Sequence, residues 1–210
     1  MFKDTIVITN RKLVKGDYLE QIRKVVSLMP YGLILREKDL DDEEYKRLSM
    51  EILKICGENQ VRCFLHSRYG IAAMLGCSNI HLSLTSFLEN EKKLDDFEQI
   101  SVSCHSMDDV KKALAHGATQ IILGTIFETE CKKGLKGKGL LFVREVCDYC
   151  RSYGNIPVFA IGGITPDNIE DVKKAGARGG CMMSYMMQKA GCRFCFLRRE
   201  HWEGSYGIQF

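Results

Sequence analysis

A pair of glycines, Gly162 and Gly163, stands between a short apolar run and a segment typical of a helix start. The run at 157–161 predicts a buried parallel strand, and the Thr-Pro-Asp sequence at 165–167 predicts the first turn of a helix. A strand that turns through two glycines into a helix presents free backbone N–H groups and the positive end of the helix dipole. Glycine also permits a positive φ and the close approach of an anion. The segment therefore predicts a phosphate site, with an ordinary strand-to-helix turn as the alternative.

The composition limits the classes of protein to consider. The chain has 210 residues, 45% of them hydrophobic, and a formal net charge of +3. Its acidic and basic residues are interspersed, which does not indicate nucleic-acid binding. No apolar stretch reaches the length of a membrane span, and the first four residues lead into a strand without a secretory signal. We therefore expect a cytoplasmic protein with no nucleic-acid and no membrane partner.

Short apolar runs alternate with amphipathic helical patterns along the chain. The strand-like runs lie at 5–9, 33–35, 63–65, 80–82, 100–103, 121–123, 158–161 and 180–183. Eight such units separated by helices predict an α/β fold, a (β/α)8 TIM barrel in a single compact domain. An open doubly wound sheet is the alternative, but Asn10 and Arg11 follow the first strand in place of a glycine-rich loop. We expect the barrel at 1–187 and an atypical C-terminal segment at 188–210.

A barrel would bring the carboxyl ends of its strands together at one mouth, where active sites lie. Several residues, most of them polar, basic or small, lie at or directly after the ends of the predicted strands. They are Arg36, Lys38, His66, Ser103, Thr125, Gly162, Gly163, Met183 and Ser184. The glycine- and lysine-rich loop at 132–138 suits a flexible lid over an anionic substrate. The mouth is therefore expected to bind a phosphorylated small molecule.

The ten cysteines offer a second kind of chemistry. Two pairs, Cys147 with Cys150 and Cys192 with Cys195, have the Cys-x-x-Cys spacing of a tetrahedral zinc site. The first pair lies within a helical pattern in which both side chains share the buried face, and the gap between the pairs is long. Free thiols packed in the core are the preferred interpretation, and we predict no metal site.

Four segments together resemble one family. They are GTIFETECKKGL at 124–135, LREKD at 35–39, SCHS at 103–106 and AIGGI at 160–164. In this order they are similar to the TenI branch of the thiamin phosphate synthase/TenI family. The resemblance implies a (β/α)8 barrel, a homodimer, and a thiazole phosphate as the ligand. It adds Thr129 and Lys132 to the candidate phosphate-binding residues.

The resemblance implies one of two reactions. The synthase joins a pyrimidine diphosphate to the thiazole phosphate and uses Mg²⁺, which neutralises the departing pyrophosphate. The family's aspartates are expected where this chain has Ser67 and Ser86, and its glutamine where this chain has Ile34. Arg36 and Lys38 remain. The carboxylate site for Mg²⁺ is therefore expected to be lost.

The other reaction is a proton transfer that aromatises the thiazole, and it needs no cofactor. TenI-type enzymes have a histidine where this chain has Thr125. His66 could serve as the base from a neighbouring strand, since a histidine titrates near pH 6.5, or it could simply fill the barrel rim. His66 and Thr125 are thus the candidate catalytic residues. We rank a thiazole tautomerase first, a synthase with an altered Mg²⁺ site second, and a non-catalytic phosphate-binding regulator third.

Overall fold

The computed structural model describes residues 2–128 and 137–188. The strands are β1 (Thr5–Ile8), β2 (Gly32–Leu35), β3 (Arg62–His66), β4 (Asn79–Ser83), β5 (Gln99–Cys104), β6 (Gln120–Gly124), β7 (Val158–Ile161) and β8 (Gly179–Met182). The α-helices are α1 (Tyr18–Val26), α2 (Asp42–Glu58), α3 (Tyr69–Met74), α4 (Leu84–Glu89), α5 (Met107–Ala115), α6 (Gly139–Gly154), α7 (Ile169–Lys174) and α8 (Ser184–Gln188). Short 3₁₀ helices, η1 (Arg11–Leu13) and η2 (Glu91–Lys93), follow β1 and α4.

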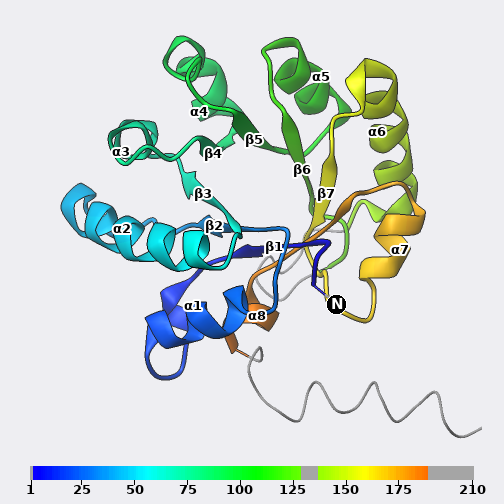
Figure 1. Ribbon diagram of the computed structural model, residues 1–210. Coiled ribbons are helices and arrows are strands. Elements are labelled where there is room, and N and C mark those ends of the chain that lie inside the picture. Colours follow the sequence, from blue (N-terminus) through cyan, green and yellow to red (C-terminus); the bar gives the residue numbers. More distant parts are fainter. Residues whose placement is uncertain (1, 129–136, 189–210) are drawn as a thin grey trace, which may run out of the picture.

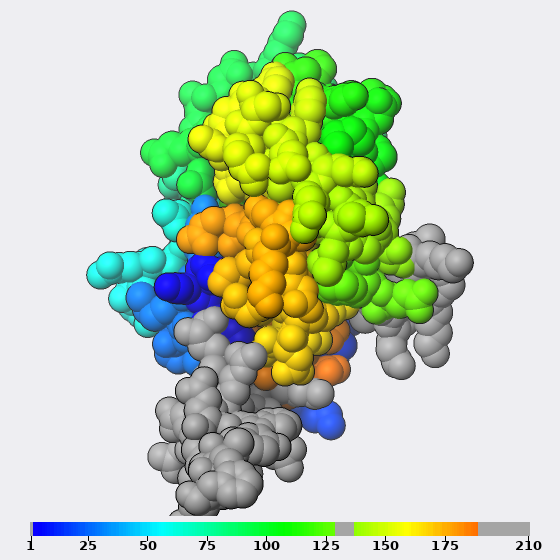
Figure 2. All heavy atoms as spheres, turned by 90° about the vertical axis from the view of Figure 1, so that its right-hand side faces the viewer, coloured from blue at the N-terminus to red at the C-terminus, as the bar shows by residue number. Residues whose placement is uncertain are grey.

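The eight strands are parallel and form a closed barrel in chain order, with β1 paired to both β2 and β8. The helices surround the strands (Figure 1), and Figure 2 shows the outer face that α6 and α7 cover. The barrel predicted from the alternating runs is therefore confirmed, and the open sheet is wrong. The predicted boundary at 187–188 stays a prediction, because residues 189–210 lie outside the described part of the chain.

Each strand sends alternate side chains to the helices and to the barrel interior. Most inward positions are apolar. They include Ile6, Ile8, Ile34, Phe64, Ile122, Phe159 and Cys181. On β4, β5 and β6 the buried polar residues are His81, Ser101 and Gln120. The interior therefore has a polar sector beneath one side of the mouth.

The barrel closes where β8 meets β1. Ile6 is in register with Cys181, and the N–H of Gly180 donates to the carbonyl of Asp4 at 3.0 Å. A Cβ placed on Gly179 would overlap the backbone of Asp4. Closure of the barrel therefore requires glycine at this position.

Within the described ranges, none of the helices is both long enough and apolar enough to cross a membrane.

Candidate active site

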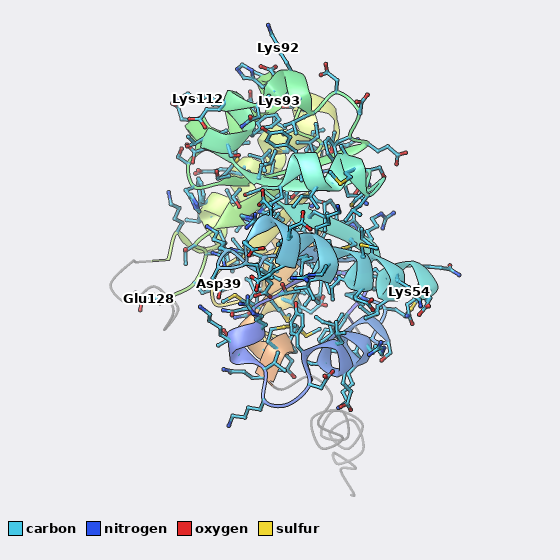
Figure 3. All side chains as sticks on the ribbon, turned by 90° about the vertical axis from the view of Figure 1, so that its left-hand side faces the viewer. Asp39, Lys54, Lys92, Lys93, Lys112 and Glu128 are labelled. Atoms are coloured by element: carbon cyan, nitrogen blue, oxygen red, sulfur yellow. The ribbon has the colours of Figure 1, made fainter. Side chains whose placement is uncertain are left out.

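The carboxyl ends of the strands form the mouth, and the loops after β2 and β6 project on this side. Figure 3 shows Asp39 and Glu128, one from each of these loops, at the same side of the molecule. Arg36 is half-buried directly after β2, and Met183 packs against the interior cluster directly after β8. The fold therefore places these predicted residues at the mouth.

His66 ends β3 beside the basic residues of the β2 loop. Burial, followed by the charges of Arg36 and Lys38, lowers the pKa of His66 to about 4. Its imidazole is consequently neutral at pH 7. Among the described carboxylates, none lies within ion-pair distance of Arg36 or Lys38. This side of the mouth therefore carries positive charge that no acidic side chain of the described ranges neutralises.

A cavity of about 320 Å³ opens between the β2 and β3 loops. It is lined by Glu37, Lys38, Tyr45, His66, Ser67 and Arg68. Glu37 already accepts from the backbone N–H of Arg11 at 3.0 Å and from the hydroxyl of Tyr18 at 3.2 Å. Arg68 donates to the carbonyl of Leu40 at 2.5 Å and pairs with Asp42. Lys38, the neutral His66 and Ser67 are left to meet a ligand in this cavity.

Tyr45 of α2 is a residue that the sequence interpretation missed. Its hydroxyl donates to the carbonyl of Leu35 at 2.7 Å and accepts from the N–H of His66 at 2.9 Å. It therefore joins the end of β2 to the end of β3 and holds His66 in place. The helical pattern of α2 indicates a buried aromatic residue at this position, but the strand partners of its hydroxyl leave no mark in the sequence.

The glycine turn after β7 forms the opposite side of the mouth. Gly162 and Gly163 have φ values of +99° and +66°. The carbonyl of Gly162 accepts from the N–H of Phe127 at 3.0 Å, and that of Gly163 accepts from the side chain of Asn168 at 2.8 Å. Across the described ranges, the N–H groups of the two glycines donate to no main-chain acceptor. We therefore expect these amides to be able to bind an anion.

The helix starts later than the predicted first turn at 165–167. The helix α7 begins at Ile169, after the cap residue Asn168. The N–H of Thr165 donates to the side-chain oxygen of Asn168 at 2.9 Å, and the carbonyl of Thr165 accepts from the N–H of Ile169 at 3.1 Å, so residues 165–168 form a turn that leads directly into the helix. Because α7 has only six residues, its dipole is small, and the phosphate prediction rests on the amides of Gly162 and Gly163.

Thr125 follows β6 and lies against this glycine turn. A Cβ on Gly162 would approach the Thr125 methyl carbon to 2.5 Å, and the carbonyl of Thr125 accepts from the backbone N–H of Lys138 at 3.0 Å. His105 donates through Nδ1 to the carbonyl of Gly124 at 2.6 Å and so holds the end of β6. Thr125 therefore lies on the β6–β7 side of the mouth, whereas His66 lies on β3. The barrel does not bring the two candidate catalytic residues together.

The remaining predicted residues are placed as follows. Ser103 lies near the end of β5, where its hydroxyl oxygen is 3.0 Å from Nε2 of His81. Ser184 is the first residue of α8, directly after β8. Thr129 and Lys132 lie outside the described residues.

The residues that the structure describes do not fit a divalent cation of the Mg²⁺ type. Such a cation is held by carboxylate oxygens, but Ser67 and Ser86 stand at the expected positions and Glu37 is already bound. In the described ranges no three His, Cys, Asp or Glu side chains converge as metal ligands. The expected loss of the Mg²⁺ site stays a prediction.

The thiols likewise behave as core residues. Cys147 and Cys150 are buried on α6, and burial raises their pKa values to about 12 and about 11, which keeps both protonated. Cys192 and Cys195, the other half of the zinc spacing, lie outside the described residues.

Comparison with known proteins identifies the family. The model of a family described as thiamine monophosphate synthase matches residues 5–186. The putative thiamine-phosphate synthase 2 of Aquifex aeolicus is 31% identical over 182 residues, which cover 86% of this chain and 96% of that protein. The thiamine-phosphate synthase of Clostridium tetani is 26% identical over 186 residues, 87% of each chain.

A solved structure shows the same fold. The thiamine phosphate pyrophosphorylase of Pyrococcus furiosus superimposes with a TM-score of 0.74 at 23% identity, over 89% of this chain and 88% of that one. Given the family match across nearly the whole described barrel, this chain belongs to the thiamine monophosphate synthase/TenI family of thiamine biosynthesis.

Proposed function

We propose that the protein is a thiamine-phosphate synthase, which joins a thiazole phosphate to a pyrimidine diphosphate. The observation that carries this proposal is that two groups of candidate anion ligands lie at one mouth. The free amides of Gly162 and Gly163 lie after β7, and the unneutralised Arg36 and Lys38 lie after β2. A reaction between two phosphorylated substrates needs two such places, whereas an isomerase of one thiazole phosphate needs one. The names of the relatives support the same choice.

In this reaction the thiazole nitrogen attacks the methylene carbon of the pyrimidine. The carbon–oxygen bond to the diphosphate breaks, and pyrophosphate leaves with the electron pair. We assign the thiazole monophosphate to the amides of Gly162 and Gly163 and the pyrophosphate to Arg36 and Lys38. Fixed cations of this kind stabilise the charge that develops on the leaving group.

The family's synthase branch uses Mg²⁺ at this step, and the donor set of this chain does not fit that ion. No step of the proposal is therefore routed through a metal. Arg36 and Lys38 are the groups of this chain that would bear the pyrophosphate charge.

A thiazole tautomerase is the second candidate, and one observation favours it. The imidazole of His66 is neutral at pH 7, and its ring nitrogens have no partner on another described residue. A neutral imidazole at the mouth can accept a proton from a substrate. This reaction would use one anion site and leave Arg36 and Lys38 without a role.

The experiment supplies both precursors at 0–10 mM Mg²⁺, roughly the range that saturates weak cation sites. The assay measures thiamine phosphate and released pyrophosphate, which the coupling reaction should form in equal amounts. A parallel reaction follows isomerisation of the thiazole alone. We expect thiamine phosphate from the wild type, a large loss in Arg36→Gln, and a small effect in His66→Gln. Isomerisation without coupling, abolished by His66→Gln, would establish the tautomerase instead. Binding of thiazole phosphate without either product would indicate the non-catalytic regulator.

A further inference from the structure

A chain of three hydrogen bonds runs through the polar sector of the barrel to the mouth. Gln120 donates through Nε2 to the hydroxyl oxygen of Ser101 at 3.0 Å. That oxygen lies 2.9 Å from Nδ1 of His81, and Nε2 of His81 lies 3.0 Å from the hydroxyl oxygen of Ser103. Gln120, Ser101 and His81 are all buried, and Ser103 is half-buried at the mouth. The imidazole thus bridges two inward positions of β5 that are two residues apart.

His81 has a single ring proton at neutral pH. Burial, followed by the charges of His66 and Arg36, lowers the pKa of His81 to about 3. The surrounding bonds must therefore decide which nitrogen carries the proton.

The bond from Gln120 decides the direction. Since Ser101 already accepts from Gln120, its own proton is free to be donated to Nδ1 of His81. Nε2 then carries the ring proton and donates to Ser103. In the opposite arrangement, Nδ1 would donate to Ser101, and no hydrogen bond within the described ranges gives the buried Ser101 proton an acceptor. Leaving a buried hydroxyl proton without an acceptor is unfavourable, which favours the first arrangement.

The chain cannot conduct protons, because its inner end is the amide of Gln120. An amide neither takes up nor releases a proton near neutral pH. The three bonds therefore fix the direction in which each serine hydroxyl donates its proton. At the mouth, the hydroxyl that they orient is that of Ser103.

We infer that His81 is a positioning residue that, as its Nε2–H form, turns the Ser103 hydroxyl proton toward the mouth as a donor to the anionic oxygens of the substrate. Ser103 has no other hydrogen bond to a described residue, so its proton is available for this bond. A donor fixed in advance loses less freedom when the substrate binds, which is how a preorganised site stabilises charge. The inference rests on the proposed function in taking the ligand to be phosphorylated.

The first test observes the ring directly and does not depend on activity. The full chain is labelled with ¹⁵N-histidine, and the His81 signals are assigned by their loss in His81→Gln. We expect an unprotonated Nδ1 and a protonated Nε2 at pH 7. A protonated Nδ1, alone or together with Nε2, would overturn the inference.

The second test measures the affinity for inorganic pyrophosphate by calorimetry. We expect Ser103→Ala to weaken binding by about tenfold, the effect of one hydrogen bond to a charged group. Ser101→Ala should weaken binding by less, because the hydroxyl of Ser103 remains but loses its fixed direction. Ser101→Thr, which keeps a hydroxyl at this position, should restore the affinity. In the Ser103→Ala background, Ser101→Ala should cause no further loss. An equal loss in both backgrounds would mean that Ser101 acts only on the fold.

The outcomes also separate this inference from the proposed function. Binding of pyrophosphate with the expected variant pattern, but no synthesis of thiamine phosphate, would overturn only the proposed function. A wild-type protein that binds neither pyrophosphate nor thiazole phosphate would overturn both.

Discussion

Lowering the pH from 7 to 5 should destabilise the protein through its two buried imidazoles. Folding lowers the pKa of His66 to about 4 and that of His81 to about 3, against about 6.5 in an unfolded chain. Between these values the unfolded chain binds protons that the folded chain excludes. The free energy of unfolding is therefore highest above pH 6.5 and falls as the pH drops toward the folded-state values.

The size of the loss follows from the same pKa values. At pH 5 each unfolded imidazole is almost fully protonated and each folded one almost fully neutral. Linkage then gives a loss of about 2 kcal/mol for each histidine, or about 4 kcal/mol together. The carboxylates of Asp4 and Asp109, whose pKa values folding also lowers, act mainly below this window because an unfolded aspartate titrates near pH 4.

Urea unfolding followed by fluorescence at pH 7, 6 and 5 measures this loss, with the slope against urea held in common. The matched variant is His66→Gln, which removes one of the two titrating groups and should leave a loss of about 2 kcal/mol. Equal losses in the wild type and in His66→Gln, or no loss between pH 7 and 5, would refute the assignment of the effect to buried neutral imidazoles.

Three further predictions concern the mouth and the core. Gly163→Ala should weaken thiazole phosphate binding at least tenfold, since its Cβ would lie 2.7 Å from the Cβ of Phe127. The control is Gly76→Ala, which has nearly the same φ but open space around it and should lower only the stability, by about 1 kcal/mol. Equal losses of binding in the two variants, measured by calorimetry, would contradict this prediction. Arg36→Gln and Lys38→Gln should each weaken pyrophosphate binding several-fold. The exposed Lys54, on the opposite side of the molecule from Asp39 in Figure 3, provides the control Lys54→Gln, for which unchanged affinity is expected. The seven buried cysteines should react with a thiol reagent only on unfolding, and rapid reaction of more than three of the ten thiols in the native protein would disprove their burial.

The fold could be predicted because parallel barrel strands are buried on both faces, so each appears as a short apolar run between turns. The runs around Leu33–Leu35 and Val158–Ile161 are clear examples, since all of these residues but Ile161 are fully buried. The helix α4 has no clear amphipathic pattern, because it is short and rich in hydroxyl residues, with Phe87 as its buried residue. Its start depends on a cap, Ser83, that a sequence pattern does not separate from the end of β4.

The candidate site was only partly predictable, for a related reason. Arg36 and Gly163 follow apolar runs directly, and their places at the mouth follow from the closed barrel. The start of α7 depended on the side chain of Asn168, which bonds to the turn before it. The roles of Tyr45 and Gln120 depend on partners 10 to 21 residues away that only the folded barrel brings near.

The glycine at position 179 has a consequence beyond local packing. A barrel leaves no strand with an unpaired edge, and here that protection depends on the last strand reaching the first across a gap that admits no side chain. A chain with a larger residue at this position would keep seven good strands and expose two open edges to other copies of itself. Solubility, more than thermal stability, is therefore the property that this glycine safeguards.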